Sequence, residues 1–176
     1  MSSWETKRPR EFTDLQRFRQ RTSTCLVYSL VRYQADWSLR ELDTEITLLG
    51  KESASATSVY NLVTFTTNAR LNVTIPAIPL YSNLQSTSRT TNGYGSVVTP
   101  SQFEGTFLLT TTNGQAEVDV VRNEDPAGKQ RDVHWDFEKM AGGVAKGSKR
   151  WGGGYGRHGK GNVVLSSTNA PVRLLL

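Results

Sequence analysis

The chain has almost no cysteine, which excludes a fold held together by disulfides. Its one cysteine, Cys25, lies in an apolar run and is expected to be a buried thiol. Because a lone cysteine cannot form an intramolecular disulfide, a reducing compartment is the expected environment. The chain also has only two histidines, His134 and His158, so the sequence offers little support for a cysteine nucleophile activated by a neighbouring base.

Long apolar stretches are missing as well. No segment approaches the roughly 20 consecutive apolar residues that a membrane-spanning helix needs. The first five residues, Met-Ser-Ser-Trp-Glu, have neither the apolar core of a signal peptide nor the glycine of a myristoylation signal. Any membrane attachment is therefore expected to be peripheral.

The patterns that usually indicate an enzyme or a metal site are weak. One histidine with three nearby carboxylates is a poor zinc set, and a solvated surface helix explains that cluster better. The cluster comprises Asp132, His134, Asp136 and Glu138. Residues 154–159 match G-x-G-x-x-G, yet no strand precedes them and no acidic ribose ligand follows. The sequence therefore predicts no catalytic residue, no metal and no cofactor.

Positive charge is concentrated in two segments. The chain holds 21 Lys and Arg against 16 Asp and Glu. Residues 1–21 carry a net charge of +3 and residues 142–161 carry +5, whereas residues 22–141 sum to −4. Such segments favour contacts with nucleic acid or an anionic membrane face. The candidate polyanion- or membrane-binding residues are Lys7, Arg8, Arg10, Arg17, Arg19, Arg21, Lys146, Lys149, Arg150, Trp151, Tyr155, Arg157 and Lys160.

Strand and helix signals alternate in the first half of the chain. A β-branched and aromatic composition predicts a strand over 24–33. Ser38 and Glu41 form a capping box, and apolar residues at helical spacing follow them, so a helix is expected over 38–50. Two further strands are expected at 59–67 and 69–75.

The second half contains long polar stretches. Residues 82–96 have almost no core-forming side chains and are expected to be a mobile loop. Asn113-Gly114 is typical of a two-residue hairpin turn, here joining strands at 103–112 and 115–121. A short helix is expected at 132–141, and residues 163–165 and 172–176 are expected to return to the core. No internal repeat of the solenoid type is apparent.

These elements indicate an α+β fold with two or three helices. A flexible basic N-terminal arm at 1–23 precedes a single globular domain at 24–176. Within that domain, 82–96 is the mobile loop and 142–161 is a glycine-rich basic segment.

The order of the expected elements, with several local patterns, resembles the matrix proteins of rhabdoviruses, in particular the smaller, cytorhabdovirus-like proteins of plant-infecting members. Residues 31–33 lead through the aromatic and basic stretch 35–40 into a helix, as in that family. Residues 60–65, followed by Leu71 and Pro76-Ala77, look like the family's next strand and its proline-containing exit, and residues 103–109 look like its hairpin entry. The resemblance implies a twisted antiparallel sheet packed against helices.

The resemblance also implies a function. Such a protein self-associates into a homo-oligomer, condenses the viral nucleoprotein-RNA filament and links it to the anionic inner face of the envelope. Its expected locations are the virion, beneath the envelope, and the host cytoplasm, including the cytoplasmic faces of membranes. The tail of the viral glycoprotein and RNA itself are further expected partners.

Two alternatives remain open at this point. One is an RNA-binding viral coat or silencing-suppressor protein, in which the basic segments contact RNA and the strands build a jelly roll. The other is an enzyme of a type that the sequence does not reveal.

Overall fold

The computed structural model describes residues 23–28, 41–49, 59–80, 82–152 and 161–176, and within them the chain is entirely β-structure. Twelve strands are present in these residues, and no helix. Their bounds are β1 Ser23–Tyr28, β2 Glu41–Leu49, β3 Val59–Thr66, β4 Arg70–Thr74, β5 Asn83–Thr90, β6 Gly95–Val98, β7 Gly105–Thr111, β8 Ala116–Asp119, β9 Val133–Ala141, β10 Val144–Trp151, β11 Gly161–Ser167 and β12 Val172–Leu175.

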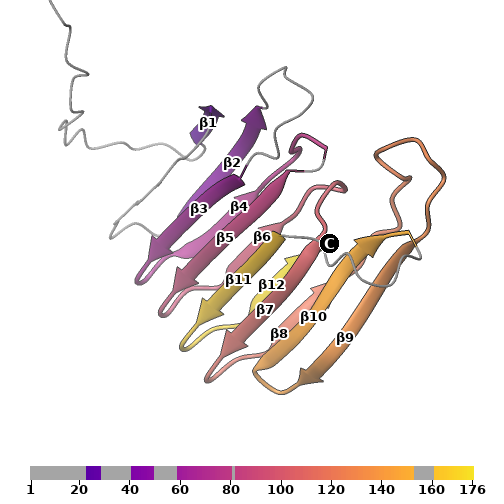
Figure 1. Cartoon of the computed structure of the whole chain (residues 1–176). Helices are drawn as coiled ribbons and strands as arrows, with labels where there is room; N and C mark the ends of the chain where they lie inside the picture. The colour runs from indigo at the N-terminus through magenta and orange to yellow at the C-terminus, as the bar shows by residue number, and fades with distance from the viewer. Residues whose placement is uncertain (1–22, 29–40, 50–58, 81, 153–160) are drawn as a thin grey trace, which may run out of the picture.

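The strands form two facing sheets, as Figure 1 shows. The first has the order β2-β4-β6-β12-β8, with β1 added beside β2, and all its pairings are parallel. The second has the order β3-β5-β11-β7-β10-β9. Its first four strands are parallel, whereas β10 is antiparallel to both β7 and β9.

Four pairs of consecutive strands lie in opposite sheets and are joined by tight turns. We call such a unit an arch: two strands that face each other across the core instead of pairing by backbone hydrogen bonds. The four arches are β3–β4, β5–β6, β7–β8 and β11–β12. The last of them does not sit at the end of the stack, because β11 lies between β5 and β7 while β12 lies between β6 and β8.

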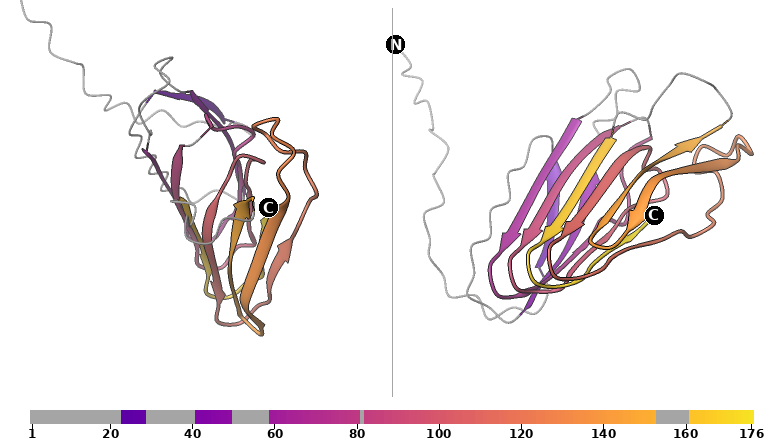
Figure 2. Two further views of the ribbon diagram at one scale, coloured as in Figure 1. Left: turned by 45° about the vertical axis from the view of Figure 1, so that its right-hand side comes forward. Right: turned by 90° about the horizontal axis from the view of Figure 1, so that it is seen from below.

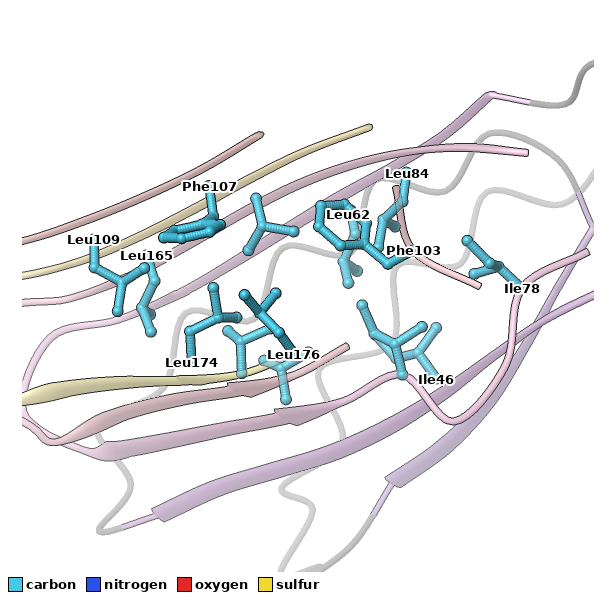
Figure 3. Packing of buried hydrophobic residues seen from close by; sticks show 14 of the residues in the cluster. Ile46, Leu62, Ile78, Leu84, Phe103, Phe107, Leu109, Leu165, Leu174 and Leu176 are labelled. Atoms are coloured by element: carbon cyan, nitrogen blue, oxygen red, sulfur yellow. The ribbon is translucent and has the colours of Figure 1, made fainter. Parts of the chain in front are cut away.

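Alternation along each strand builds the core between the two sheets. In β3 the residues at even positions are buried and those at odd positions are less so, as the period of a strand requires. Neighbouring strands are in register, so inward side chains form rows, for example Leu62, Ser86, Val163 and Phe107. Figure 3 shows the leucines and phenylalanines of both sheets meeting in the middle. The two layers are visible edge-on in Figure 2.

The expected α+β fold is wrong, and so is the antiparallel sheet on helices that the resemblance implied. The predicted helix at 38–50 is strand β2 where the structure describes it. Thr44, Ile46 and Leu48, at every second residue of β2, are buried. Because one of these buried residues is a polar threonine, hydropathy alone did not indicate the strand period. The predicted helix at 132–141 is strand β9, in which Val133, Trp135 and Phe137 recur at every second residue.

Three further expectations at loops and turns are corrected. Residues 82–96 are not a mobile loop, because they include β5, the turn that follows it and the start of β6. The strands around Asn113-Gly114 exist, but they form an arch and not a hairpin, since β7 and β8 belong to different sheets. The glycine-rich segment 142–161 contains the regular strand β10 at Val144–Trp151.

Other expectations are confirmed in substance. Strands at 59–67 and 69–75 correspond to β3 and β4, and the C-terminal apolar stretches are β11 and β12. The basic residues expected in the 1–23 arm, from Lys7 to Arg21, lie outside the described residues.

Candidate functional site

The four arch turns share a short sequence, and this repeat escaped the sequence analysis. Each turn has Thr or Ser, then Thr, then Asn, then Ala or Gly. In the order of stacking, the four turns are residues 66–69, 90–93, 167–170 and 111–114. The repeat is present in the sequence, but its spacing is too uneven to indicate a period. The first two asparagines are 24 residues apart, whereas Asn113 and Asn169 are 56 apart.

The asparagines of these turns form a continuous ladder. Asn92 Nδ2 donates to Asn68 Oδ1 at 2.6 Å, and Asn169 Nδ2 donates to Asn92 Oδ1 at 2.6 Å. Asn113 Nδ2 completes the row by donating to Asn169 Oδ1 at 2.7 Å. All three hydrogen bonds point toward the β3 end of the stack. The ladder therefore has a direction, and it runs through the C-terminal arch at its centre.

A second polar row runs beside the ladder inside the turn. In three of the four turns, the first hydroxyl donates to the backbone carbonyl of the Ala or Gly in the neighbouring turn. These bonds join Thr90 to Ala69 at 3.2 Å, Ser167 to Gly93 at 3.3 Å and Thr111 to Ala170 at 2.8 Å. The hydroxyl at the β3 end, Thr66 Oγ1, is buried and has no hydrogen-bond partner. The second row therefore lacks an acceptor at the β3 end, which is the end toward which its donors point.

We expect the ladder to stabilise the stack measurably. Asn169→Ala removes two side-chain hydrogen bonds, whereas Asn68→Ala at the end of the ladder removes one. At about 0.5–1 kcal/mol for each exposed bond, the first change should lower the free energy of unfolding by about 1–2 kcal/mol and the second by about half as much. Chemical denaturation of both variants measures this. Equal losses would show that the ladder does not act as a series of independent bonds.

The structure separates the predicted basic and aromatic residues that it describes. Lys146 and Arg150 lie on the outer face of β10, and Lys146 Nζ is paired with Glu138 at 2.5 Å. Lys149 and Trp151 occupy inward positions of the same strand and are buried. The remaining predicted members of this segment, Tyr155, Arg157 and Lys160, lie outside the described residues. The described part of the segment is therefore a strand and not a flexible arm.

Lys149 is the most unusual charged group in the described residues. Its residue is 1% exposed, and Nζ has no hydrogen-bond partner. The ammonium group lies 5.9 Å from the centre of the Trp151 ring, at the outer limit of a cation–π contact. Burial lowers the pKa of Lys149 to about 8, and the charge of Glu104 opposes this shift only in part. Trp135, the cross-strand partner of Lys149 in β9, also has a buried indole N–H without a partner.

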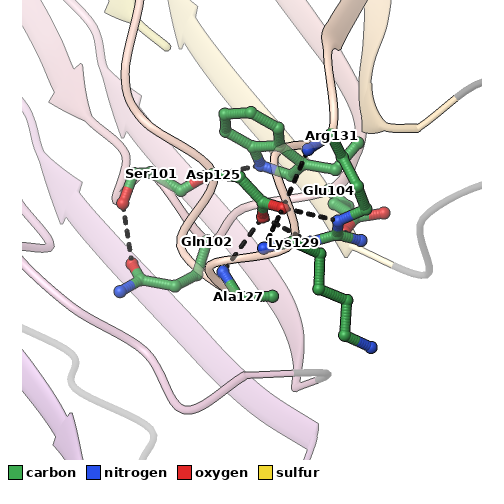
Figure 4. Close-up of polar contacts among 8 residues, drawn as sticks. Ser101, Gln102, Glu104, Asp125, Ala127, Lys129 and Arg131 are labelled. Atoms are coloured by element: carbon green, nitrogen blue, oxygen red, sulfur yellow. Dashed lines mark hydrogen bonds and ion pairs between the residues drawn. The ribbon is translucent and has the colours of Figure 1, made fainter.

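The loop that precedes β9 is organised around one carboxylate (Figure 4). Asp125 accepts hydrogen bonds from the backbone N–H groups of Ala127, Lys129 and Arg131 and from the Arg131 guanidinium. The guanidinium, assisted by these backbone groups, holds the pKa of the Asp125 carboxyl well below its usual range. Glu104 lies 3.7 Å from the same guanidinium. An aspartate of this chain thus occupies a nest of N–H groups that would otherwise suit an anion.

The cluster around His134 is extended rather than helical. Asp132 directly precedes β9, and the other three residues lie within it. In the ranges that the structure describes, no three His, Cys, Asp or Glu side chains gather closely enough to hold a metal ion.

No protein-family model, curated protein or solved structure matches this chain. The part of the chain that the structure describes includes no helix able to cross a membrane. The chain's function is therefore inferred from its own geometry, and the features that stand out are the polar rows and the two ends of the stack.

Proposed function

We propose that this chain is a non-catalytic structural protein that self-associates through the ends of its stacked arches. The observation that carries the proposal is the open β3 end. In the described residues, β3 pairs only with β5, and the buried Thr66 hydroxyl finds no acceptor there. Unpaired strand edges are ready-made templates for another chain. A protein that must assemble can use such an edge, whereas a monomeric protein usually blocks it.

A viral matrix role is the biological setting that we propose for this assembly. The protein would coat the nucleoprotein-RNA filament in the virion and in the host cytoplasm and link it to the inner face of the envelope. The net charge of +3 in residues 1–21, together with Arg150 on the outer face of β10, supports contact with anionic lipid or RNA. The jelly-roll version of the RNA-binding alternative receives no support, because that fold is built from antiparallel strands and these arches stack in parallel.

Sedimentation velocity of nuclease-treated protein over a wide concentration range tests the self-association. We expect species larger than the monomer that grow with concentration. Flotation with anionic and with neutral vesicles, at low and at physiological salt, tests the lipid contact. Salt-sensitive binding to anionic vesicles is expected. It should be lost when the six basic residues of the 1–23 arm are changed to serine and kept when only Lys146, which is already paired with Glu138, is changed. A protein that stays monomeric at every concentration would contradict the proposal.

A further inference from the structure

The exposed apolar side chains gather at the two ends of the stack. Among the described residues, the large exposed ones include Val59 and Val63 in β3, at one end of its sheet, and Phe137 and Met140 in β9, at the other end. Val120 and Val121 directly follow β8, which ends the other sheet on the β9 side. Leu80 is the exception, since it lies in the connection between β4 and β5. A stack whose ends meet other chains would cover most of this surface.

The two edge strands of the second sheet differ in chemistry. β3 has the sequence VYNLVTFT, with no charge, proline or glycine. β9 has the sequence VHWDFEKMA, with three charged side chains, and its pairing with β10 contains an irregularity in register. Two β9 edges brought together would place Asp136 and Glu138 near their own copies, and like charges across strands are destabilising. An uncharged β3 edge meets β9 without that repulsion.

The direction of the strands allows β9 to continue the sheet beyond β3. Because β10 is antiparallel to β7 and β9 is antiparallel to β10, β9 runs in the same direction as β7 and hence as β3. A second copy shifted along the stack, without being turned over, therefore places its β9 beside β3 in a parallel pairing. The two strands have similar lengths, nine and eight residues. β3 alternates along its whole length and β9 does so from Val133 to Phe137, before its bulge, so inward and outward side chains can match over that part of the join.

The row of turn hydroxyls also ends without an acceptor at this end of the stack. Thr90, Ser167 and Thr111 each donate to a backbone carbonyl one layer closer to the β3 end. Thr66 belongs to the same row and is fully buried, yet its hydroxyl has no partner. A buried hydroxyl without a partner costs on the order of 1–3 kcal/mol. A further strand beside β3 would bring backbone carbonyls to the position toward which the row points.

We propose that copies of this chain join head to tail, with β9 of one copy adding in parallel to the β3 edge of the next. This inference rests on the proposed self-association and specifies its interface. The contact is heterologous, so that every assembly keeps one free β3 edge and one free β9 edge and can grow as an open filament. At each junction the β3 edge that carries Val59 and Val63 lies beside the β9 edge that carries Phe137 and Met140.

Two single variants, studied alone and mixed, test the head-to-tail contact. Val63→Lys places a charge on the β3 edge and Met140→Lys places one on the β9 edge. Both positions are exposed, at 42% and 48%, so each variant should fold and show an unfolding midpoint close to that of the parent chain. Each variant alone should be monomeric by sedimentation velocity. An equimolar mixture should form a 1:1 dimer, because each variant retains the edge that the other has lost. Leu80→Lys, also at an exposed position but in the connection between β4 and β5 and on neither edge strand, is the matched control and should assemble like the parent chain.

The outcomes separate this inference from the proposed function. If the parent chain assembles and both variants assemble equally well, the edges named here are wrong while self-association stands. If both variants are monomeric and their mixture stays monomeric, the contact is not head to tail. If a chain that lacks residues 1–22 assembles better than the parent chain, those residues and not a second copy cover β3 in the parent chain, which overturns the inference. If the parent chain itself never assembles, the proposed function fails as well.

Discussion

Gly93→Ala should destabilise this protein more than adding or removing a single methyl group at any other position of an arch turn. A Cβ atom at residue 93 would lie 1.8 Å from the carbonyl oxygen of Ala69 and 2.4 Å from its carbonyl carbon. Both contacts are with the backbone of the neighbouring arch, so no side chain can rotate away. The β3–β4 and β5–β6 arches would have to separate, and the hydrogen bonds of both polar rows would lengthen with them. We expect a loss of at least about 3 kcal/mol in the free energy of unfolding.

The reverse exchange in another layer of the same stack is the matched control. Ala170 occupies the equivalent position of its turn and is 9% exposed. Ala170→Gly removes one methyl group and adds backbone freedom to the unfolded chain, which should cost about 1–2 kcal/mol. Denaturant titration of the two variants measures the difference. A Gly93→Ala protein as stable as the Ala170→Gly protein would contradict the close stacking of the turns.

Lys149→Met should stabilise the protein at neutral pH. The ammonium group is buried beside Trp151 without a hydrogen-bond partner, and burial lowers its pKa from 10.5 to about 8. A methionine fills similar volume without a charge, and such replacements of buried charges are often stabilising. A pKa difference of this size corresponds to a gain on the order of 3 kcal/mol.

The pH dependence gives a second, independent sign of the same effect. Below pH 8, Lys149 is charged in both the folded and the unfolded chain, so the full penalty of burial is present. Between about pH 8 and 10.5 the unfolded chain binds more protons at this residue than the folded chain, and stability must rise with pH. Lys149→Met should lack that rise, so the difference in unfolding free energy between the two proteins should shrink as the pH increases. A methionine variant that is less stable than the parent at pH 7 would show that Lys149 has a partner which we have not identified.

The sequence predicted strands well where apolar residues occupy the inward positions. β3, β4, β7, β11 and β12 all carry Val, Leu, Ile or Phe in their buried rows, and all were expected. β5 was missed because Ser86, Ser88 and Thr90 fill three of its inward positions. Two of these hydroxyls form hydrogen bonds within the stack: Ser88 Oγ accepts from Thr64 at 2.8 Å and Thr90 Oγ1 donates to the Ala69 carbonyl at 3.2 Å, so polar residues can be buried there. Hydropathy along one chain segment cannot reveal such a partner.

The parallel arrangement could not be predicted from local turn signals. Asn-Gly is typical of hairpins, yet Asn113-Gly114 turns the chain from one sheet into the other. What distinguishes the two cases is the repetition of the turn at 66–69, 90–93 and 167–170, since identical asparagines can bond to one another only when the turns stack. The last arch, β11–β12, lies between two arches that come earlier in the chain, so the order of stacking differs from the order in the sequence. No regular spacing of the turns predicts this position.

The candidate site was predicted only in part. Lys149 and Trp151 do lie together, but as buried neighbours and not as a solvent-facing polyanion site. Composition cannot distinguish a charged strand residue that points inward from one in a flexible arm. The edges of β3 and β9 were not anticipated at all, because which strand ends a sheet depends on the whole topology.

The position of the C-terminal arch is the central claim about this fold, and engineered disulfides test it most directly. In a chain carrying Cys25→Ser, cysteine pairs are introduced at three outward positions in register, Arg89 in β5, Ser166 in β11 and Thr110 in β7. Adjacent strands are about 4.8 Å apart, within the reach of a disulfide, whereas strands two places apart are separated by about 10 Å, beyond it. Mild oxidation should therefore cross-link residue 166 to residue 89 and, in a second variant, to residue 110. It should leave the pair at 89 and 110 reduced. Efficient cross-linking of 89 to 110 would contradict the account, because β5 and β7 would then be direct neighbours.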